Sequence, residues 1–174
     1  MPDHHERMAP SVNISLIGMP GAGKSTIGVL LAKAISWNFV DIDLLIQVAE
    51  ERTLQEIIRS EGIERFIRIE QRHTLIMDRR QHVIATGGSV VYGAAAMEHL
   101  RSLGTIVHLD VPLPTLENRL ENLNGRGVIM GPGQTLHGIF QQRQPLYQHY
   151  ADVTIDCANR TQDEIVDGII ARLT

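Results

Sequence analysis

At 174 residues the chain is long enough for one domain with a hydrophobic core and short for two. Its net charge of −4 argues against broad nucleic-acid binding, and no apolar run approaches the roughly 20 residues that a membrane span needs. The single cysteine, Cys157, excludes an intramolecular disulfide and any zinc site built from several cysteines, so we expect a globular domain of cytoplasmic type.

Strand and helix patterns alternate along the chain. Residues 1–11 lack the apolar segment of a signal peptide, so we expect a short disordered lead and one domain over residues 12–174. Strands separated by helices predict an α/β fold with a parallel sheet covered on both faces. The expected elements are strand 13–18, helix 24–36, strand 38–42, helices 53–60 and 63–80, strand 82–86, helix 94–103, strand 105–111, helices 114–122 and 136–150, strand 152–156 and helix 161–173.

The first strand runs into GMPGAGKST, residues 18–26, which matches the phosphate-binding pattern G-x-x-x-x-G-K-[ST] in its required strand–loop–helix setting. Backbone N–H groups of such a loop converge on phosphate oxygens, next to the positive end of the following helix. Lys24 would reach the β- and γ-phosphates, and the Ser25 hydroxyl is placed to bind Mg²⁺. The residues expected to bind the nucleotide are Gly21, Ala22, Gly23, Lys24, Ser25 and Thr26.

A P-loop occurs in GTPases, motor ATPases and small-molecule kinases, so other residues must decide between them. The guanine motif N-K-x-D and the switch motif D-x-x-G of GTPases are both absent from the sequence. The apolar run IVHLD ends in Asp110, which could bind magnesium as in ATPases or could simply cap a turn before Pro112. A better pair is Asp41 and Asp43 in FVDID, because residues two apart on a strand point to the same face.

The motifs together resemble the shikimate kinases of the nucleoside monophosphate kinase-like superfamily, from about residue 12 to the C-terminus. Besides the P-loop and DID, the resemblance rests on F-x-R-I-E at 66–70, GG at 87–88, Arg126 and RQPLY at 143–147. It implies a three-layer fold with a five-stranded parallel sheet of order 2-3-1-4-5 and a glycine-rich lid at about residues 122–135. It also implies an enzyme that uses ATP and Mg²⁺ to convert shikimate to shikimate 3-phosphate in aromatic amino-acid biosynthesis. Nothing in the sequence marks a dimer surface, so we expect a monomer, the default for a single compact domain.

The resemblance gives the two acids different roles. Asp41 would hold Mg²⁺ together with Ser25, while Asp43 would bind acceptor hydroxyls and draw the proton from the attacking one; Asp43 could instead be a helix N-cap. Arg126 would reach from the lid to the transferring phosphate, and Arg119 would cover the adenine ring through a cation–π contact. Either arginine could instead be a solvated surface charge, and the lid an ordinary surface loop.

The acceptor side matches the family only in part. Arg143 would bind the acceptor carboxylate through its planar guanidinium, and Gly87 and Gly88 would bring backbone N–H groups close, unless they only form a turn. The family's first arginine in F-R-R-I-E is replaced by Ile67, and its usual third glycine by Ser89, and we expect both residues to take part in binding the acceptor. Losing one charge-assisted contact costs about 1.5–3 kcal/mol, which is roughly 10–150-fold in affinity.

These departures leave the acceptor open. The change to isoleucine removes the arginine neighbour of Glu70, so an acceptor such as homoserine, with an ammonium group facing an acid, is an alternative to shikimate. An alternative from another class is a nucleotide-binding module without catalysis. We expect a small-molecule partner and neither a nucleic acid nor a membrane.

Overall fold

The computed structural model describes residues 13–122 and 132–173, so the expected N-terminal lead, Arg126 and most of the expected lid lie outside the described residues. The described elements are β1 (Asn13–Ile17), α1 (Lys24–Ala34), β2 (Asn38–Asp41), α2 (Ile42–Glu50), α3 (Leu54–Glu61), α4 (Ile63–Leu75), β3 (His82–Ala85), the 3₁₀ turn η1 (Val90–Tyr92), α5 (Ala94–Leu103), β4 (Gly104–Asp110), α6 (Leu113–Asn122), α7 (Leu136–Tyr150), β5 (Val153–Asp156) and α8 (Gln162–Leu173).

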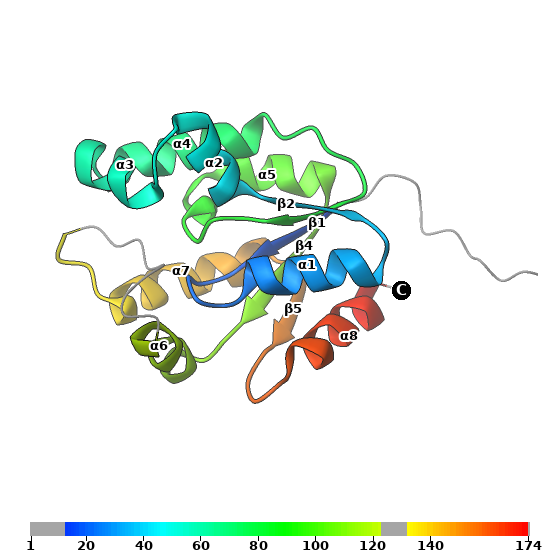
Figure 1. Ribbon diagram of the computed structural model, residues 1–174. Helices are drawn as coiled ribbons and strands as arrows, with labels where there is room; N and C mark the ends of the chain where they lie inside the picture. Colours follow the sequence, from blue (N-terminus) through cyan, green and yellow to red (C-terminus); the bar gives the residue numbers. More distant parts are fainter. Residues whose placement is uncertain (1–12, 123–131, 174) are drawn as a thin grey trace, which may run out of the picture.

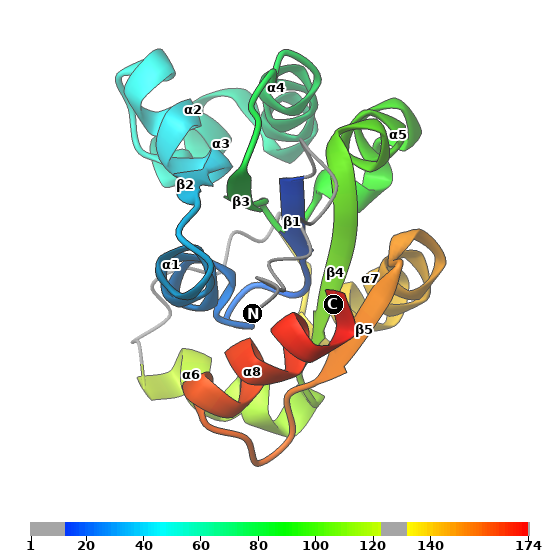
Figure 2. The same ribbon diagram turned by 90° about the vertical axis from the view of Figure 1, so that its right-hand side faces the viewer.

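The five strands form one parallel sheet with the order β2-β3-β1-β4-β5, which confirms the predicted topology. Helices α1 and α8 cover one face, and α4, α5 and α7 lie on the other (Figures 1 and 2). All five residues of the central strand β1 are buried, as expected for a parallel strand between two helical layers. The functional loops therefore start from a rigid centre.

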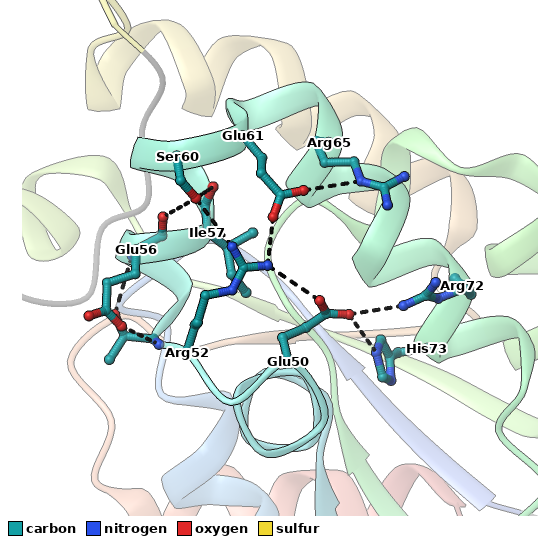
Figure 3. A network of polar contacts seen from close by, with 10 residues as sticks. Glu50, Arg52, Glu56, Ile57, Ser60, Glu61, Arg65, Arg72 and His73 are labelled. Atoms are coloured by element: carbon teal, nitrogen blue, oxygen red, sulfur yellow. Dashed lines mark hydrogen bonds and ion pairs between the residues drawn. The ribbon is translucent and has the colours of Figure 1, made fainter.

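Helices α2, α3 and α4 pack against one another near the β2 end of the sheet and share a second apolar cluster. Ile42, Ile46 and Ile57 are fully buried there, together with Phe66 and Ile69 of α4. A chain of ion pairs joins the polar sides of the same helices (Figure 3). Because exposed ion pairs contribute little individually, we assign the stability of this unit to its apolar cluster.

The ion-pair chain in Figure 3 connects the ends of three helices. Arg52 donates to Glu61 over 2.6 Å, and Glu61 also accepts from Arg65 over 3.3 Å. Glu50 accepts from Arg72 over 2.9 Å. The pairs link the C-terminal end of α2 to α4, both directly and through α3, and α4 forms one wall of the cavity described below.

The chain after β2 differs from the sequence expectation. The strand was predicted to continue to residue 42, but it ends at Asp41, whose Oδ1 accepts from the backbone N–H of Leu44 at 3.2 Å and so caps α2. Asp43 therefore lies in the first turn of a helix. It is neither on the strand beside Asp41 nor an N-cap, and both interpretations were wrong. The acids still lie close together because they flank the strand-to-helix junction.

One further boundary is corrected. The helix predicted over residues 63–80 ends at Leu75, where the N–H of Met77 bonds to the carbonyl of Thr74 in a tighter turn before β3. Among the described residues, no helix is both long enough and apolar enough to cross a membrane.

Candidate active site

A cavity of about 260 Å³ lies where the loops leave the carboxyl ends of the central strands, the usual ligand position in open parallel sheets. It gathers the loop after β1, the first turn of α2, the start of α4, the loop after β3 and one side chain of α7. Its lining residues are Pro20, Gly21, Gly23, Lys24, Ser25, Thr26, Asp43, Ile63, Phe66, Thr86, Gly88, Ser89 and Arg143.

The loop between β1 and α1 has the shape of a phosphate cradle. Gly21 and Gly23 adopt φ angles of 79° and 93°, in the left-handed region that favours glycine. Gly23 is the N-cap of α1 and has no side chain to cap the helix. No capping group therefore occupies the first N–H groups of the helix, which face the cavity side. The buried Lys24 donates from Nζ to the carbonyls of Gly18 at 2.8 Å and Met19 at 3.0 Å. Burial lowers the pKa of Lys24 to about 8.

Two side chains with oxygen atoms that could bind a metal ion, Ser25 and Asp41, lie together at the end of the loop. The Ser25 hydroxyl donates to Asp41 Oδ2 at 2.5 Å. Within the described ranges, no group of three or more His, Cys, Asp and Glu side chains could hold a metal ion by itself. Magnesium is commonly held by one or two protein oxygens, with water and substrate phosphates completing its shell. The pair therefore fits Mg²⁺ bound jointly with a nucleotide.

Asp43 is the acid that lines the cavity. Burial raises the pKa of Asp43 to about 6, and the nearby Lys24 charge counteracts part of that rise. Its Oδ1 is buried and has no hydrogen-bond partner among the described residues. A buried carboxyl oxygen with a free acceptor position is suited to a hydroxyl group. Near neutral pH this carboxyl could orient that hydroxyl and accept its proton.

Arg143 enters the cavity from α7 and is only 3% exposed. Its Nε donates to the hydroxyl of Tyr92 at 3.3 Å, and its guanidinium carbon lies 5.3 Å from the centre of the Tyr92 ring. One turn later, Tyr147 donates from its hydroxyl to the carbonyl of Gly88 at 2.6 Å. The two tyrosines thus fix the arginine and the loop after β3. Sequence reasoning assigned neither a role, although Tyr147 closes the quoted motif RQPLY.

A second acid lies directly behind the cavity wall. Glu70 is fully buried on α4, and the Ser89 hydroxyl donates to its Oε2, while its Oε1 has no partner within the described part of the chain. A Cβ added to Gly87 would lie 1.9 Å from that Oε1 and 2.8 Å from Asp43 Oδ1, so both free oxygens face the Gly87 backbone. Burial, the largest cause, and the nearby Asp43 raise the pKa of Glu70 to about 7.

Ile67 packs against the apolar cluster of α2, α3 and α4 and does not line the cavity. The cavity lining does not support the predicted contact between Ile67 and the acceptor, which stays a prediction. Asp110 also lies outside the lining and accepts from Gln144 at 2.7 Å, a contact between β4 and α7. That contact is a tertiary one and not the turn or cap before Pro112 that was the alternative to magnesium binding.

A second cavity of about 410 Å³ lies against the other side of the P-loop. Arg119 lines it and donates from Nη1 to the carbonyl of Gly21 at 3.0 Å, so this predicted nucleotide residue does lie beside the phosphate cradle. Arg160, from the β5–α8 connection, and Gln162, the first residue of α8, also line it and were missed, because no motif marks them. Gly21, Gly23 and Thr26 border both cavities.

Comparison with known proteins agrees with this geometry. A family model described as shikimate kinase matches residues 20–174. The chain belongs to the shikimate kinase family. The shikimate kinase of Synechococcus sp. (strain RCC307) is 37% identical over 166 residues, with 92% of this chain and 84% of that one covered. The shikimate kinase of Sulfurihydrogenibium sp. (strain YO3AOP1) is 32% identical over 162 residues, with 92% and 97% covered.

Solved structures lead to the same family. The shikimate kinase of Acinetobacter baumannii in complex with shikimate superposes with a TM-score of 0.85 at 28% identity, with 94% of this chain and 93% of that one covered. The shikimate kinase of Aquifex aeolicus gives a TM-score of 0.78 at 27% identity, with 93% and 96% covered. Kinases of this family transfer a phosphoryl group from ATP to a small molecule, and this chain is a small-molecule kinase.

Proposed function

We propose that this chain transfers the γ-phosphoryl group of ATP to the 3-hydroxyl of shikimate. One observation carries the proposal: the free carboxyl oxygen of Asp43, the P-loop lysine Lys24 and the buried guanidinium of Arg143 meet in one cavity. That set matches an acceptor with a hydroxyl at one end and a carboxylate at the other. Membership of the shikimate kinase family supports shikimate as this acceptor.

Asp43 would orient the attacking hydroxyl. The hydroxyl donates its proton to the free carboxyl oxygen as its own oxygen bonds to the γ-phosphorus, and the bond from that phosphorus to the bridging oxygen of ADP breaks. Because phosphoryl transfer depends mainly on positioning and on neutralising charge, Lys24 would contribute by stabilising the phosphate oxygens. Burial holds the pKa of Asp43 at about 6, so the carboxyl is ionised at neutral pH yet basic enough to take a proton.

Arg143 would hold the acceptor by its carboxylate. A planar guanidinium binds a carboxylate through two parallel hydrogen bonds, and such contacts strengthen in a buried site. Tyr92 holds the Arg143 side chain in position, and Tyr147 holds the Gly88 backbone, so the acceptor would bind to groups that are already positioned. The acceptor is therefore held at a fixed distance from Asp43.

Ser25 and Asp41 would hold Mg²⁺ with the nucleotide. When bound, the metal supplies positive charge that offsets the charge on the phosphate oxygens. The Ser25–Asp41 contact holds the two oxygen atoms beside the P-loop, apart from Asp43, which would bind the acceptor. We extend the proposal to Arg126 as a lid residue that reaches the transferring phosphate and to Arg119 as the cover of the adenine ring. The monomeric state and the cytoplasmic location stay predictions.

The test is ADP release in a coupled assay with Mg-ATP and either shikimate or homoserine as acceptor. We expect the higher kcat/KM for shikimate. Asp43→Asn should lower kcat by about 100-fold or more, the usual contribution of a general base, while the Kd for ATP stays the same. The control is Asp78→Asn, which changes an exposed acid remote from the cavity lining and should leave both constants unchanged. Equal losses of ATP binding and turnover in Asp43→Asn would refute the assigned role.

A further inference from the structure

Ser89 and Glu70 are in contact although they belong to different sequence motifs, and no motif predicts that contact. Ser89 lines the cavity, whereas Glu70 is fully buried behind it. The hydroxyl oxygen of Ser89 forms a short contact with Glu70 Oε2. Where the family has an arginine and a glycine, this chain has Ile67 and Ser89, so a neutral hydroxyl takes the place of an arginine as the partner of the buried acid.

The direction of this hydrogen bond depends on the proton of Glu70. A serine hydroxyl has one hydrogen to donate and can also accept. When Glu70 is ionised, the carboxylate can only accept, and the single hydrogen of Ser89 is used on it. When Glu70 carries a proton, the acid can donate to Ser89, and the serine hydrogen becomes free to point into the cavity. The pair therefore presents an acceptor or a donor to the cavity, depending on one proton.

The charged groups around the Glu70–Ser89 pair also link the protonation of Glu70 to the binding of an acceptor carboxylate. Glu70 is faced by Asp43 from α2, by Lys24 from α1 and by Arg143 from α7, and the element that carries Ser89 adds no charge. Arg143 Nη1 lies 2.9 Å from the position that a Cβ on Gly88 would take, next to Ser89 in the chain. An acceptor carboxylate on Arg143 would thus arrive near Ser89, where an ionised Glu70 repels it and a neutral Glu70 does not.

We propose that the Glu70–Ser89 pair determines acceptor specificity: the acceptor carboxylate binds to Arg143 and the Ser89 hydroxyl, and its binding takes up one proton onto Glu70. This rests on the proposed function, because it assumes an acceptor with a carboxylate. The donor from Ser89 then replaces part of what the missing arginine at position 67 supplies in the family. Burial, as the largest cause, places the pKa of Glu70 at about 7, so the proton is exchanged near neutral pH.

The experiment is calorimetric titration of shikimate into the full-length chain at pH 6 to 8.5, in two buffers with different enthalpies of ionisation. We expect up to about one proton taken up per shikimate at pH 8. The Kd for shikimate should rise by about tenfold or more across this range, the value of one charge-assisted contact. At each pH the nucleotide Kd of a Ser89→Ala variant should equal that of the wild type, because Ser89 lies outside the second cavity.

Three variants separate the pair from the other titrating groups. Glu70→Gln mimics the neutral acid, so its shikimate Kd should depend on pH much less than that of the wild type and stay near the wild-type value at pH 6, with most of the proton uptake lost. Ser89→Ala removes the donor and should weaken shikimate binding at pH 6 by about tenfold, with a much smaller effect at pH 8.5. Ile67→Arg places a cation one turn before Glu70, keeps the acid ionised and should likewise remove most of the proton uptake.

The outcomes distinguish this inference from the proposed function. If shikimate binds and is phosphorylated but Glu70→Gln takes up as many protons as the wild type, the pair has no such role and the kinase function stands. Equal loss of affinity at every pH in Ser89→Ala would likewise reduce Ser89 to a packing residue. If shikimate neither binds nor reacts at any pH, both proposals are refuted.

Discussion

Substituting Gly87 with alanine tests the geometry of the acceptor site most directly. The added Cβ would lie 1.9 Å from Glu70 Oε1 and 2.8 Å from Asp43 Oδ1, whereas real Cβ atoms stay at least 3.0 Å from other heavy atoms. The carboxyl of Glu70 would have to retreat by about 1 Å within a fully buried, close-packed part of the molecule. Asp43 Oδ1, the atom proposed to orient the acceptor, lies inside the same limit and would have to move by a few tenths of an ångström.

The size of the effect follows from this displacement. Overpacking a buried position costs about 1–3 kcal/mol of folding free energy, and a misplacement of about 1 Å in the acceptor pocket can lower the rate by about 100-fold. We therefore expect Gly87→Ala to lower kcat/KM for shikimate by about 100-fold, with the KM for ATP nearly unchanged. The assay is ADP release at varied shikimate and at varied ATP, with urea unfolding to confirm that the variant is folded.

A matched control is Gly168→Ala. Its Cβ would meet Arg160 at 3.6 Å, an ordinary contact, and the residue lies within helix α8. Alanine is the better helix former by about 1 kcal/mol, so this variant should be slightly more stable and equally active. A normal kcat/KM for shikimate in Gly87→Ala would refute the close approach of Asp43 and Glu70 to this backbone.

Three further perturbations test other parts of the site. Lys24→Ala should lower kcat by at least about 100-fold with a smaller effect on folding, and a near-normal rate would remove the P-loop lysine from the mechanism. Tyr147→Phe should lower the free energy of unfolding by about 1–3 kcal/mol, since it leaves the Gly88 carbonyl without its donor; an unchanged urea midpoint would contradict this. The pKa of Glu70 is raised to about 7, so the folded state binds more protons than the unfolded state between about pH 4.5 and 7. Stability should therefore fall as pH rises through that window, and Glu70→Gln should be the more stable protein at pH 8, by on the order of 3 kcal/mol, but not at pH 4.5.

Much of the fold was predictable because its signals are local. The P-loop motif fixed one strand, one loop and one helix, and the alternation of apolar runs gave five parallel strands. Helix α2 was not predicted because FVDIDLLI is apolar except for its two acids, and the periodicity of such short runs does not distinguish strand from helix. The cap formed by Asp41 decided the outcome, and a cap of this kind depends on a backbone turn that periodicity does not register.

The candidate site was predictable where it follows motifs and unpredictable where it depends on tertiary contacts. Lys24, Asp43, Gly88, Ser89 and Arg143 were all expected at the site, and all line the first cavity. The partnership of Ser89 with the buried acid of α4 depends on how the loop after β3 packs against that helix. A sequence pattern contains no information on such a contact between distant segments.

The shared border of the two cavities has a consequence for inhibitor design. Gly21, Gly23 and Thr26 line both cavities, so the proposed adenosine side and the proposed acceptor side of the site are separated by little more than the P-loop itself. A single compound that joins an adenosine to a small hydroxy acid through a short linker would bind its second half at a high effective concentration. Its affinity should greatly exceed that of either half, and its acid half could be chosen for the Ser89 hydroxyl.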